Sequence, residues 1–507
     1  MERTAASCGD RRCPGPIIVR RERNPMNYFE QRLLPEERGV IPYLPTMPEF
    51  IDFLNRYEDA VALSDSERQV TFTELTKHVA IRRGMLARKG IAPGSNIGLI
   101  GKNSIDEAEW LMAATSYGCA VVLFPGVMRA EVLKGAVPFY DVVLMIADQD
   151  QMEKLEGFPT IDMSALEGEP APAGQVSAKD PATVFFTGGT TGKPKGVVLS
   201  HGALLRGVHN GTYRPGTMFG QRLVAALPFT HVFGMVFSLL SGLMAGAEVG
   251  VCADMRQLFR EMQRVHPTTM VAVPGMAEVM LTIARTRGIE ALGGQLKTII
   301  CGAAPVPPTL YKGFLEFGVT LHAGYGMTET ANLVCGNLEL GDDPESMGHE
   351  YPDQEARIVD GELQVKGDML FSGYWKDPKA TAEAMTEDGW LRTGDLARIS
   401  EDGKFYIIGR IKNLIILSNG ENVSPEEVEA TYYKSSLIKD CLAYEGSING
   451  KQVILLEVQP SQGVTDEQVL AEVDRYTKEL PSTMQPAKVI LRHEDFEKSP
   501  SMKIIRK

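Results

Sequence analysis

The sequence predicts an α/β protein with a large N-terminal domain of doubly wound parallel sheets, a β-rich subdomain, and a small α+β C-terminal domain. A chain of 507 residues is too long for one compact core, so two or more domains are expected. From Val70 onward, apolar runs of strand length alternate with helical segments. After about Arg410 the pattern changes to an α+β segment that is roughly a hundred residues long, which is enough for its own core.

Strand and helix alternate in recurring βαβ units. The first contains helix 73–89, strand 96–100, helix 104–117 and strand 119–124; later units contain strand 269–273 with helix 276–286, and strand 297–301 with helix 310–317 and strand 319–322. Such units form parallel sheets that are covered by helices and bind ligands at the carboxyl ends of the strands. Small residues stand at two of these ends, in 302–305 and 324–326, and leave room for a flat ligand. Short β-runs and turns over 361–408 predict the β-rich subdomain.

The composition excludes several classes of protein. The net charge of −13 argues against a nucleic-acid or anionic-membrane footprint. The cysteines are seven, scattered and without a Cys-x-x-Cys pair, which suits a reducing cytoplasm and neither a disulfide scaffold nor a zinc site. The longest run without a charged residue, 223–247, contains Pro228 and His231 and predicts a buried helix, not a membrane span. Peripheral contact with a membrane through apolar surface stays open.

The N-terminal residues 1–25 are rich in arginine and proline and lack a sustained apolar stretch, so no signal peptide is visible. We expect a disordered tail here, or an initiator that lies upstream of a true start at Met26. An organelle transit segment is a third alternative.

The stretch 184–200 is the strongest motif. Two β-rich runs flank a loop in which glycines allow the backbone amides to approach a ligand, while threonines and lysines add donors and charge. A mobile hairpin turn is the plainer alternative, but this composition favours a polyphosphate cradle. A Walker A loop is excluded, because Thr187 replaces its first glycine, Pro194 replaces its hydroxyl residue, and the loop leads into a strand.

This stretch resembles the phosphate loop of the adenylate-forming superfamily, which contains acyl-CoA synthetases, carrier-protein adenylation domains and firefly-type luciferases. The usual form is Thr-Ser-Gly-Thr-Thr-Gly-x-Pro-Lys-Gly, and this chain departs from it at Gly188. The resemblance covers essentially all of 70–507. It implies that ATP is held by Thr187, Gly188, Gly189, Thr190, Thr191, Gly192 and Lys195.

Gly324-Tyr-Gly-Met-Thr-Glu-Thr330 resembles the family's second motif. By this resemblance Tyr325 lays its ring on the adenine, Thr328 donates to a phosphate oxygen, and Glu329 holds Mg²⁺. Without the resemblance, the motif would indicate a turn from strand to helix that is capped by the glutamate. Many relatives place a polar residue where this chain has Ala323, so the backbone of Gly302, Ala303 and Ala304, with Gly324, is expected to meet the adenine.

Trp390-Leu-Arg-Thr-Gly-Asp-Leu396 and Gly409-Arg-Ile-Lys-Asn413 carry the third resemblance. It implies that Asp395 accepts from the ribose hydroxyls and that Arg410 contacts ribose or phosphate. Lys412 then marks the hinge between an adenylation domain of residues 26–411 and a small, mobile lid domain of residues 412–507. Asn413 stands where aspartate is common, and both charges could otherwise be ordinary surface residues.

Two segments of the small domain also resemble the family. The loop 417–425, with Ser418, Gly420 and Glu421, resembles the one that swings over the thiol tunnel. Lys503, near the C-terminus, resembles the lysine that bridges the acid and the α-phosphate, although Met502 replaces the usual glycine. A basic tail is otherwise simply solvated.

The acid pocket is expected around 228–240. His231 matches the family's gate beside the carboxylate, although a lone histidine in an apolar segment is more often a core residue. With Thr328, Glu329 and Lys503, His231 completes the expected catalytic set. The pocket lining is expected from His231, Val232, Phe233, Val236, Gly302, Gly324 and Met327. Because these positions supply no carboxylate to pair with an ammonium group, an apolar acid is favoured over an amino acid.

These resemblances imply an ATP-dependent acyl-CoA ligase that uses ATP, Mg²⁺ and coenzyme A to activate an apolar fatty or aryl acid. The alternatives are a ligase that loads a separate acyl carrier protein, and a catalytically silent nucleotide-binding homologue. The partners are expected to be small molecules, without nucleic acid or an integral membrane segment. The oligomeric state is open, a homodimer included.

Overall fold

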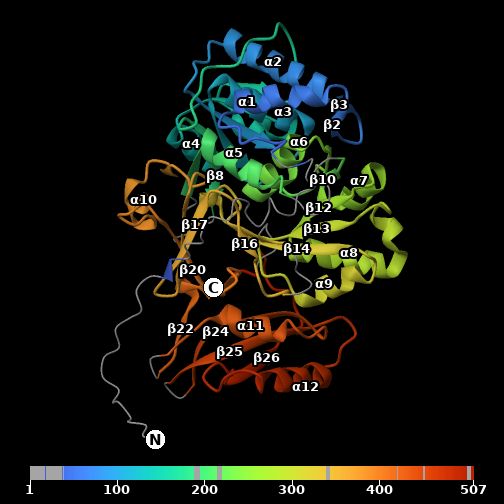
Figure 1. Ribbon diagram of the computed structural model, residues 1–507, viewed down its shortest axis with the longest axis vertical. Coiled ribbons are helices and arrows are strands. Elements are labelled where there is room, and N and C mark those ends of the chain that lie inside the picture. Colours follow the sequence, from blue (N-terminus) through green and yellow to red (C-terminus); the bar gives the residue numbers. More distant parts are fainter. Residues whose placement is uncertain are drawn as a thin grey trace, which may run out of the picture.

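The computed structural model describes residues 37, 39–187, 195–213, 220–338, 343–418, 421–448, 451–498 and 504–506, and the backbone of Ile17–Ile18. Within these residues, two large sheets and a smaller antiparallel one share a continuous apolar core, and a separate three-stranded lobe follows them (Figure 1). The predicted α/β architecture with a smaller second lobe is therefore confirmed.

The first large sheet has the order β19-β9-β8-β5-β4-β6-β7. Strands β8, β5, β4, β6 and β7 run parallel, whereas β9 and β19 are antiparallel additions at one edge. The bounds are β4 (Asn96–Gly101), β5 (Ala120–Pro125), β6 (Val142–Ala147), β7 (Thr160–Asp162), β8 (Pro181–Thr187), β9 (Lys195–Ser200) and β19 (Gly373–Tyr374). Helix α2 (Phe72–Arg88) precedes β4 in the chain, α3 (Ile105–Tyr117) connects β4 to β5, and α4 (Ala130–Phe139) connects β5 to β6. Ser104 caps α3 by accepting from the backbone N–H of Glu107.

The second large sheet has the order β16-β15-β14-β13-β12-β10-β11-β2-β3, and it is parallel from β14 to β2. Its strands are β2 (Val61–Ser64), β3 (Gln69–Thr71), β10 (Arg222–Ala225), β11 (Glu248–Val251), β12 (Thr269–Ala272), β13 (Thr298–Cys301), β14 (Thr320–Tyr325), β15 (Cys335–Asn337) and β16 (His349–Glu350). The associated helices are α7 (Leu258–Val265), α8 (Pro274–Arg287) and α9 (Pro308–Leu315). Strands β12 and β13 are buried throughout, as parallel strands with helices on both faces must be.

Helix α5 (His201–Asn210) joins the two sheets. It packs on β8 and β9 of the first sheet and on the π-helix η4 (Phe233–Leu240) and α6 (Ser241–Met244), which follow β10 of the second. Helix α1 (Met47–Leu54) contacts both α3 and α6. Every residue of α5 is buried, as expected for a helix that packs against elements of both sheets.

The β-rich subdomain is a sheet of order β1-β17-β18-β20-β21, with β1 (Ile17–Ile18), β17 (Gln354–Val359), β18 (Glu362–Gly367), β20 (Leu391–Ile399) and β21 (Phe405–Arg410). Helix α10 (Pro378–Ala384) precedes β20. The backbone groups of Ile17 and Ile18 pair with the edge strand β17, and the disordered tail over 1–25 stays a prediction. The other residues of this tail lie outside the described residues.

The second lobe has its own core, built from residues between Ile415 and Leu491. Its elements are β22 (Ile415–Ile416), β23 (Asn422–Val423), α11 (Pro425–Tyr432), β24 (Ile438–Ile448), β25 (Lys451–Pro460), α12 (Asp466–Thr477) and β26 (Lys488–Leu491). The short helix η8 (Ile411–Asn413) lies between the two cores. The boundary at 411 and 412 stays a prediction.

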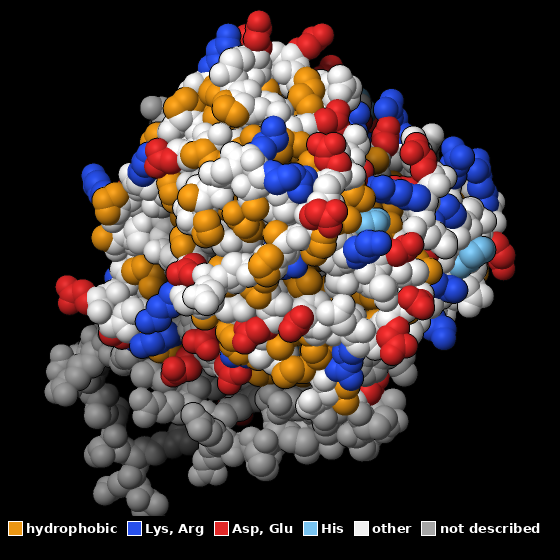
Figure 2. Space-filling view, turned by 90° about the horizontal axis from the view of Figure 1, so that it is seen from above, with side chains coloured by type: hydrophobic (Ala, Val, Ile, Leu, Met, Phe, Trp, Pro, Cys, Tyr) orange, Lys and Arg blue, Asp and Glu red, His pale blue; other side chains and the backbone are white. Residues whose placement is uncertain are grey.

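The uncharged run 223–247 is not one buried helix. Its first residues form β10, and the helical part begins at Phe233, because Pro228 and the turn through His231 separate the two. Across the described residues, every helix is too short or too polar to traverse a bilayer. From above, Figure 2 shows acidic and basic side chains interspersed with apolar ones, so this face has no large patch of one sign.

Candidate active site

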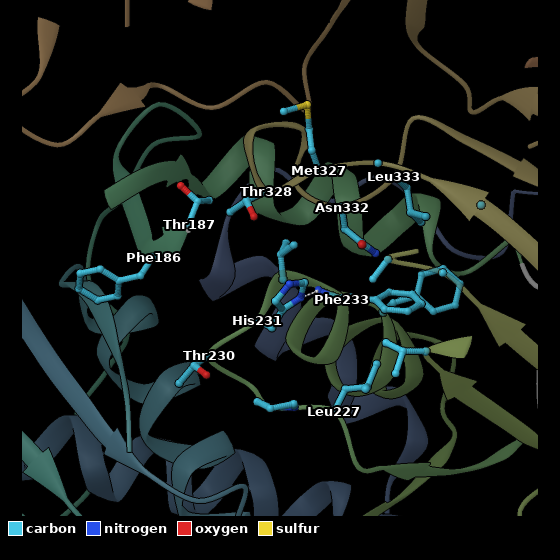
Figure 3. Close-up of a pocket in the computed structure, with 18 of the residues that line it drawn as sticks. Phe186, Thr187, Leu227, Thr230, His231, Phe233, Met327, Thr328, Asn332 and Leu333 are labelled. Atoms are coloured by element: carbon cyan, nitrogen blue, oxygen red, sulfur yellow. Dashed lines mark hydrogen bonds between the residues drawn. The ribbon is translucent and has the colours of Figure 1, made fainter. Parts of the chain in front are cut away.

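A cavity of about 960 Å³ opens between the carboxyl ends of the two large sheets. Figure 3 shows that its walls come from several segments: the end of β8, the loop after β10, and the turn that follows β14. Residues from β20 and η8 complete the lining. The β8–β9 hairpin and the β14 turn, which are far apart in the chain, therefore meet at one place.

Most of the predicted site residues within the described part of the chain line this cavity. They are Thr187, Lys195, His231, Val232, Phe233, Gly302, Ala303, Gly324, Tyr325, Met327, Thr328, Glu329, Arg410 and Lys412. Gly188, Gly189, Thr190, Thr191, Gly192, Gly420 and Lys503 lie outside the described residues. Ala304, Val236, Asp395, Ser418 and Glu421 are described but are not part of the lining.

Val236 belongs to the core and not to the cavity wall. It is fully buried, whereas Phe237 lines the cavity together with Phe233. The reason is the π-helical turn of η4, whose wider i→i+5 spacing changes the face that each residue occupies. Ala304 leaves the wall because Ala303 has a left-handed backbone, with φ of 68°, where the chain turns.

Asp395 lies behind the wall and is held by two residues that do line the cavity. Its carboxylate accepts from the Tyr325 hydroxyl at 2.6 Å and forms an ion pair with Arg410, with 2.7 Å from Nε to Oδ1. Asp395 is 2% exposed, so it is not an ordinary surface charge. Burial, and then the charge of Asp395, raise the pKa of the Tyr325 hydroxyl well above its usual value.

Glu329 is held by a residue that the sequence did not single out. The Tyr374 hydroxyl donates to Glu329 Oε1 at 2.8 Å, and the Lys195 ammonium lies 4.6 Å from the centroid of the Tyr374 ring. The backbone reinforces this contact, because the Phe371 N–H donates to the Glu329 carbonyl and β19 pairs with β9. Burial, and then the Glu329 carboxylate, raise the pKa of Tyr374. Tyr374 thus links the phosphate-loop hairpin to the β14 turn.

His231 stands at the turn between β10 and η4. Its Nδ1 accepts from the Phe233 N–H at 3.3 Å, drawn as a dashed line in Figure 3, so the ring is fixed by local backbone. Apolar side chains line the cavity together with His231, among them Phe233, Phe237 and Leu333. His322 also lines the cavity, and burial lowers its pKa to about 4, which keeps it neutral at pH 7.

The profile of one family, described as AMP-binding enzyme, matches residues 50–375, which include both large sheets and the cavity turns. The chain belongs to the AMP-binding enzyme family. Among curated proteins, it is 28% identical over 405 residues to a feruloyl-CoA synthase of Amycolatopsis sp (75% of this chain, 82% of the relative). It is 28% identical over 496 residues to the long-chain-fatty-acid–CoA ligase FadD15 of Mycobacterium tuberculosis (80% of each). It is 27% identical over 490 residues to a 2-succinylbenzoate–CoA ligase of Bacillus cereus (92% and 98%).

Solved structures share the fold of this AMP-binding enzyme. The anthranilate CoA ligase AuaEII in complex with anthranoyl-AMP aligns with a TM-score of 0.80 and 18% identity, over 90% of this chain and 95% of that one. The o-succinylbenzoate CoA synthetase MenE of Bacillus subtilis, in complex with its acyl-adenylate, aligns with a TM-score of 0.76 and 24% identity, over 90% and 96%.

The carboxylate of Glu329 fits a magnesium ion that is shared with phosphates. Within the described part of the chain, no three His, Cys, Asp or Glu side chains come together as a metal-binding group. Mg²⁺ keeps several waters and is commonly held by one or two carboxylates plus substrate phosphates, so a lone carboxylate beside Thr328 suits it. A zinc-type site that is made of protein ligands alone does not fit these residues.

Two further residues of this AMP-binding enzyme's cavity were missed from the sequence. Glu107, on the first turn of α3, is 2% exposed and lines the cavity, and one of its carboxyl oxygens has no partner among the described residues. Burial, and then the charge of Asp148, raise its pKa to about 8. Asn332 follows the Gly324–Thr330 motif, and its side chain also lines the cavity. Helix 105–117 carries three acidic residues, Asp106, Glu107 and Glu109, so the sequence does not mark Glu107 as the one that lines the cavity.

Lys412 lines the cavity from η8, and burial, then Arg410, lower its pKa. The predicted thiol-tunnel residues instead contact their own lobe: Ser418 Oγ accepts from the Gln452 N–H at 2.6 Å, and the Glu421 carbonyl accepts from Leu417. They are carried by the lobe that follows η8, so the structure does not bring them to the cavity.

Proposed function

We propose that this chain is an ATP-dependent acyl-CoA ligase that activates an apolar fatty or aryl acid. One observation carries the proposal: a single cavity joins the hydroxyls, the carboxylate and the cations of Thr187, Thr328, Glu329, Lys195 and Arg410 to an apolar pocket beside His231. The polar part suits a nucleoside triphosphate, and the apolar part suits the body of an acid. The CoA ligases named above support the same acceptor.

The proposed first step joins the acid to AMP. A carboxylate oxygen attacks the α-phosphorus, and the bond from this phosphorus to the bridging oxygen of pyrophosphate breaks, which leaves an acyl-adenylate. Thr328 and Lys195 are positioned to hold phosphate oxygens, and Arg410, fixed by Asp395, to contact ribose or phosphate. A bound Mg²⁺ would neutralise phosphate charge beside Glu329. The predicted contribution of Lys503 stays a proposal.

The second step transfers the acyl group to a thiol. The thiolate attacks the carbonyl carbon, the new C–S bond forms, and the bond to AMP breaks. The mixed anhydride makes this possible, because AMP is a far better leaving group than hydroxide. We propose that rotation about Lys412 brings the loop 417–425, with Ser418, Gly420 and Glu421, to the cavity, because the Ser418 hydroxyl here accepts from Gln452 of its own lobe.

The experiment is a screen of carboxylic acids for release of AMP and pyrophosphate, with CoA and with a phosphopantetheine-loaded carrier protein as alternative acceptors. We expect acid-dependent pyrophosphate release and thioester formation with CoA. Transfer to the carrier alone would favour the carrier-loading alternative. ATP binding without acid-dependent AMP would favour the silent homologue and contradict the proposal.

The role of Lys503 is tested separately by pyrophosphate exchange. Lys503→Ala is expected to lose adenylation while it retains ATP binding, because the lysine charge would be needed as the carboxylate attacks phosphorus. Unchanged exchange would show that this assignment is wrong.

A cytoplasmic location is also proposed, because the five cysteines within the described residues are buried free thiols; cell fractionation checks it.

A further inference from the structure

Two residues that line the cavity, Asn332 and His322, have buried side-chain nitrogens without a hydrogen-bond partner among the described residues, and only the Asn332 amide is a donor at that nitrogen in every form. Asn332 is 7% exposed, and its side-chain nitrogen is buried without a hydrogen bond to any described residue. Figure 3 shows this amide pointing toward the Phe233 ring, on the side where Leu333 also lies. A buried amide without a partner is costly, so a group that remains unpaired beside a binding cavity points to a ligand.

The turn that carries Asn332 has an uncommon backbone conformation. Asn332 has φ of 96° and follows Ala331 at φ of 48°, so two successive residues adopt the left-handed region. Asparagine tolerates this conformation better than most residues. The backbone N–H of Asn332 donates to Met327, and its carbonyl occupies the space that a side chain at Gly326 would need. The amide is therefore presented from a fixed backbone.

The surroundings limit what the amide can bind. Phe233, Phe237, Ile300 and Leu333 give the cavity lining apolar side chains, and His322, which also lines the cavity, is neutral at pH 7. The lysines and arginines of the lining belong to other segments, such as Lys195 and Arg410. A second carboxylate would have no counter-ion here, whereas a neutral oxygen could accept from the amide without burying charge.

We propose that Asn332 selects a carboxylic acid whose apolar body carries a neutral oxygen, such as a hydroxyl, methoxy or carbonyl group, over the same acid without it. The inference rests on the proposed function and narrows its substrate class. A site that is built to hydrogen-bond a substrate oxygen discriminates strongly against an analogue that lacks it, because the protein group is then left unpaired. The expected preference is on the order of tenfold or more in kcat/KM.

The test compares matched acids in the pyrophosphate-release assay: cinnamic acid with its 4-hydroxy and 4-methoxy derivatives, and octanoic acid with 7-oxooctanoic acid. Wild type is expected to prefer the oxygen-bearing acid in at least one pair. Asn332→Gly accepts the left-handed backbone but lacks the amide, and it should lose this preference while the KM for ATP is unchanged. Asn332→Asp should retain the hydroxyl acid and reject the methoxy acid, because a carboxylate accepts but cannot donate.

Ala331→Gly is the matched control, since it alters the same turn but retains the amide, and its preference should equal that of wild type. Equal use of plain and oxygen-bearing acids by wild type, or a preference that survives in Asn332→Gly, would overturn the inference while acid activation persists. If no acid of the full screen supports AMP release, the proposed function fails, and this inference, which rests on it, fails with it. The two failures are thus distinguishable.

Discussion

Removing a single oxygen, in Tyr374→Phe, tests whether the phosphate side of the cavity depends on the contact to Glu329. The phenylalanine keeps the ring under Lys195 and against Phe371, so only the 2.8 Å donation to Glu329 Oε1 is lost. A hydrogen bond to a charged group contributes about 1.5–3 kcal/mol. Since Glu329 faces a cavity that water can enter, the lower end of this range applies.

A loss of about 1.4 kcal/mol corresponds to a factor of ten, so kcat/KM for Mg-ATP should fall roughly tenfold. The assay is pyrophosphate exchange at varied ATP and Mg²⁺, with thermal unfolding measured on the same samples. The Tm should fall by no more than about 2 °C, because the chain is large and one partly hydrated bond is lost.

Tyr444→Phe is the control, because the Tyr444 hydroxyl makes the same kind of bond, to Glu457 Oε1 at 3.0 Å, in the second lobe away from the cavity. Its kcat/KM should equal that of wild type. If Tyr374→Phe exchanges pyrophosphate as wild type does at all Mg²⁺ concentrations, Tyr374 does not position Glu329 for ATP.

Three other substitutions give distinct outcomes. Asp395→Asn removes the charge that pairs with Arg410, so the KM for ATP should rise about tenfold or more, as measured by pyrophosphate exchange; an unchanged KM would refute the role of this pair. Gly326→Ala should yield little folded protein, since the new Cβ would overlap the Asn332 carbonyl oxygen; soluble protein with wild-type Tm would contradict the backbone geometry. Glu107→Gln should flatten the pH dependence of Tm. Burial raises the pKa of Glu107 to about 8 in the folded protein, so the folded state binds this proton more tightly than the unfolded chain does. The stabilisation that results is fully present below the pKa of the unfolded chain and is lost as pH rises through 8. An identical pH profile for both proteins would show that Glu107 is not the titrating group.

Much of the scaffold could be predicted because its signals are local. The helix expected over 104–117 is Ile105–Tyr117, with Ser104 as its cap, and the phosphate-loop flanks form the expected β8–β9 hairpin. The Gly324–Thr330 motif ends a strand at the cavity, as its glycines and its position after a βαβ unit indicate.

What the sequence could not predict depends on contacts between distant segments or on irregular backbone. Tyr374 meets Glu329 because β19 adds to β9, and a two-residue strand has almost no signal of its own. Val236 was placed in the pocket with the rest of 228–240, whereas in the π-helix η4 it lies in the core and Phe237 lines the cavity. Asn332 reaches the apolar end of the cavity because it and Ala331 both adopt the left-handed backbone conformation. Neither the identity of Asn332 nor that of its neighbours indicates this conformation.

The late position of β19 in the chain has a consequence for biosynthesis. The outer edge of β9 is covered by Gly373 and Tyr374, so the first sheet remains open along that edge until this part of the polypeptide has left the ribosome. An uncovered edge strand invites pairing with another chain. A nascent chain or truncated product that stops before β19 would therefore expose β9 as an unpaired edge strand, able to pair with another chain, beside an incomplete nucleotide-binding cavity.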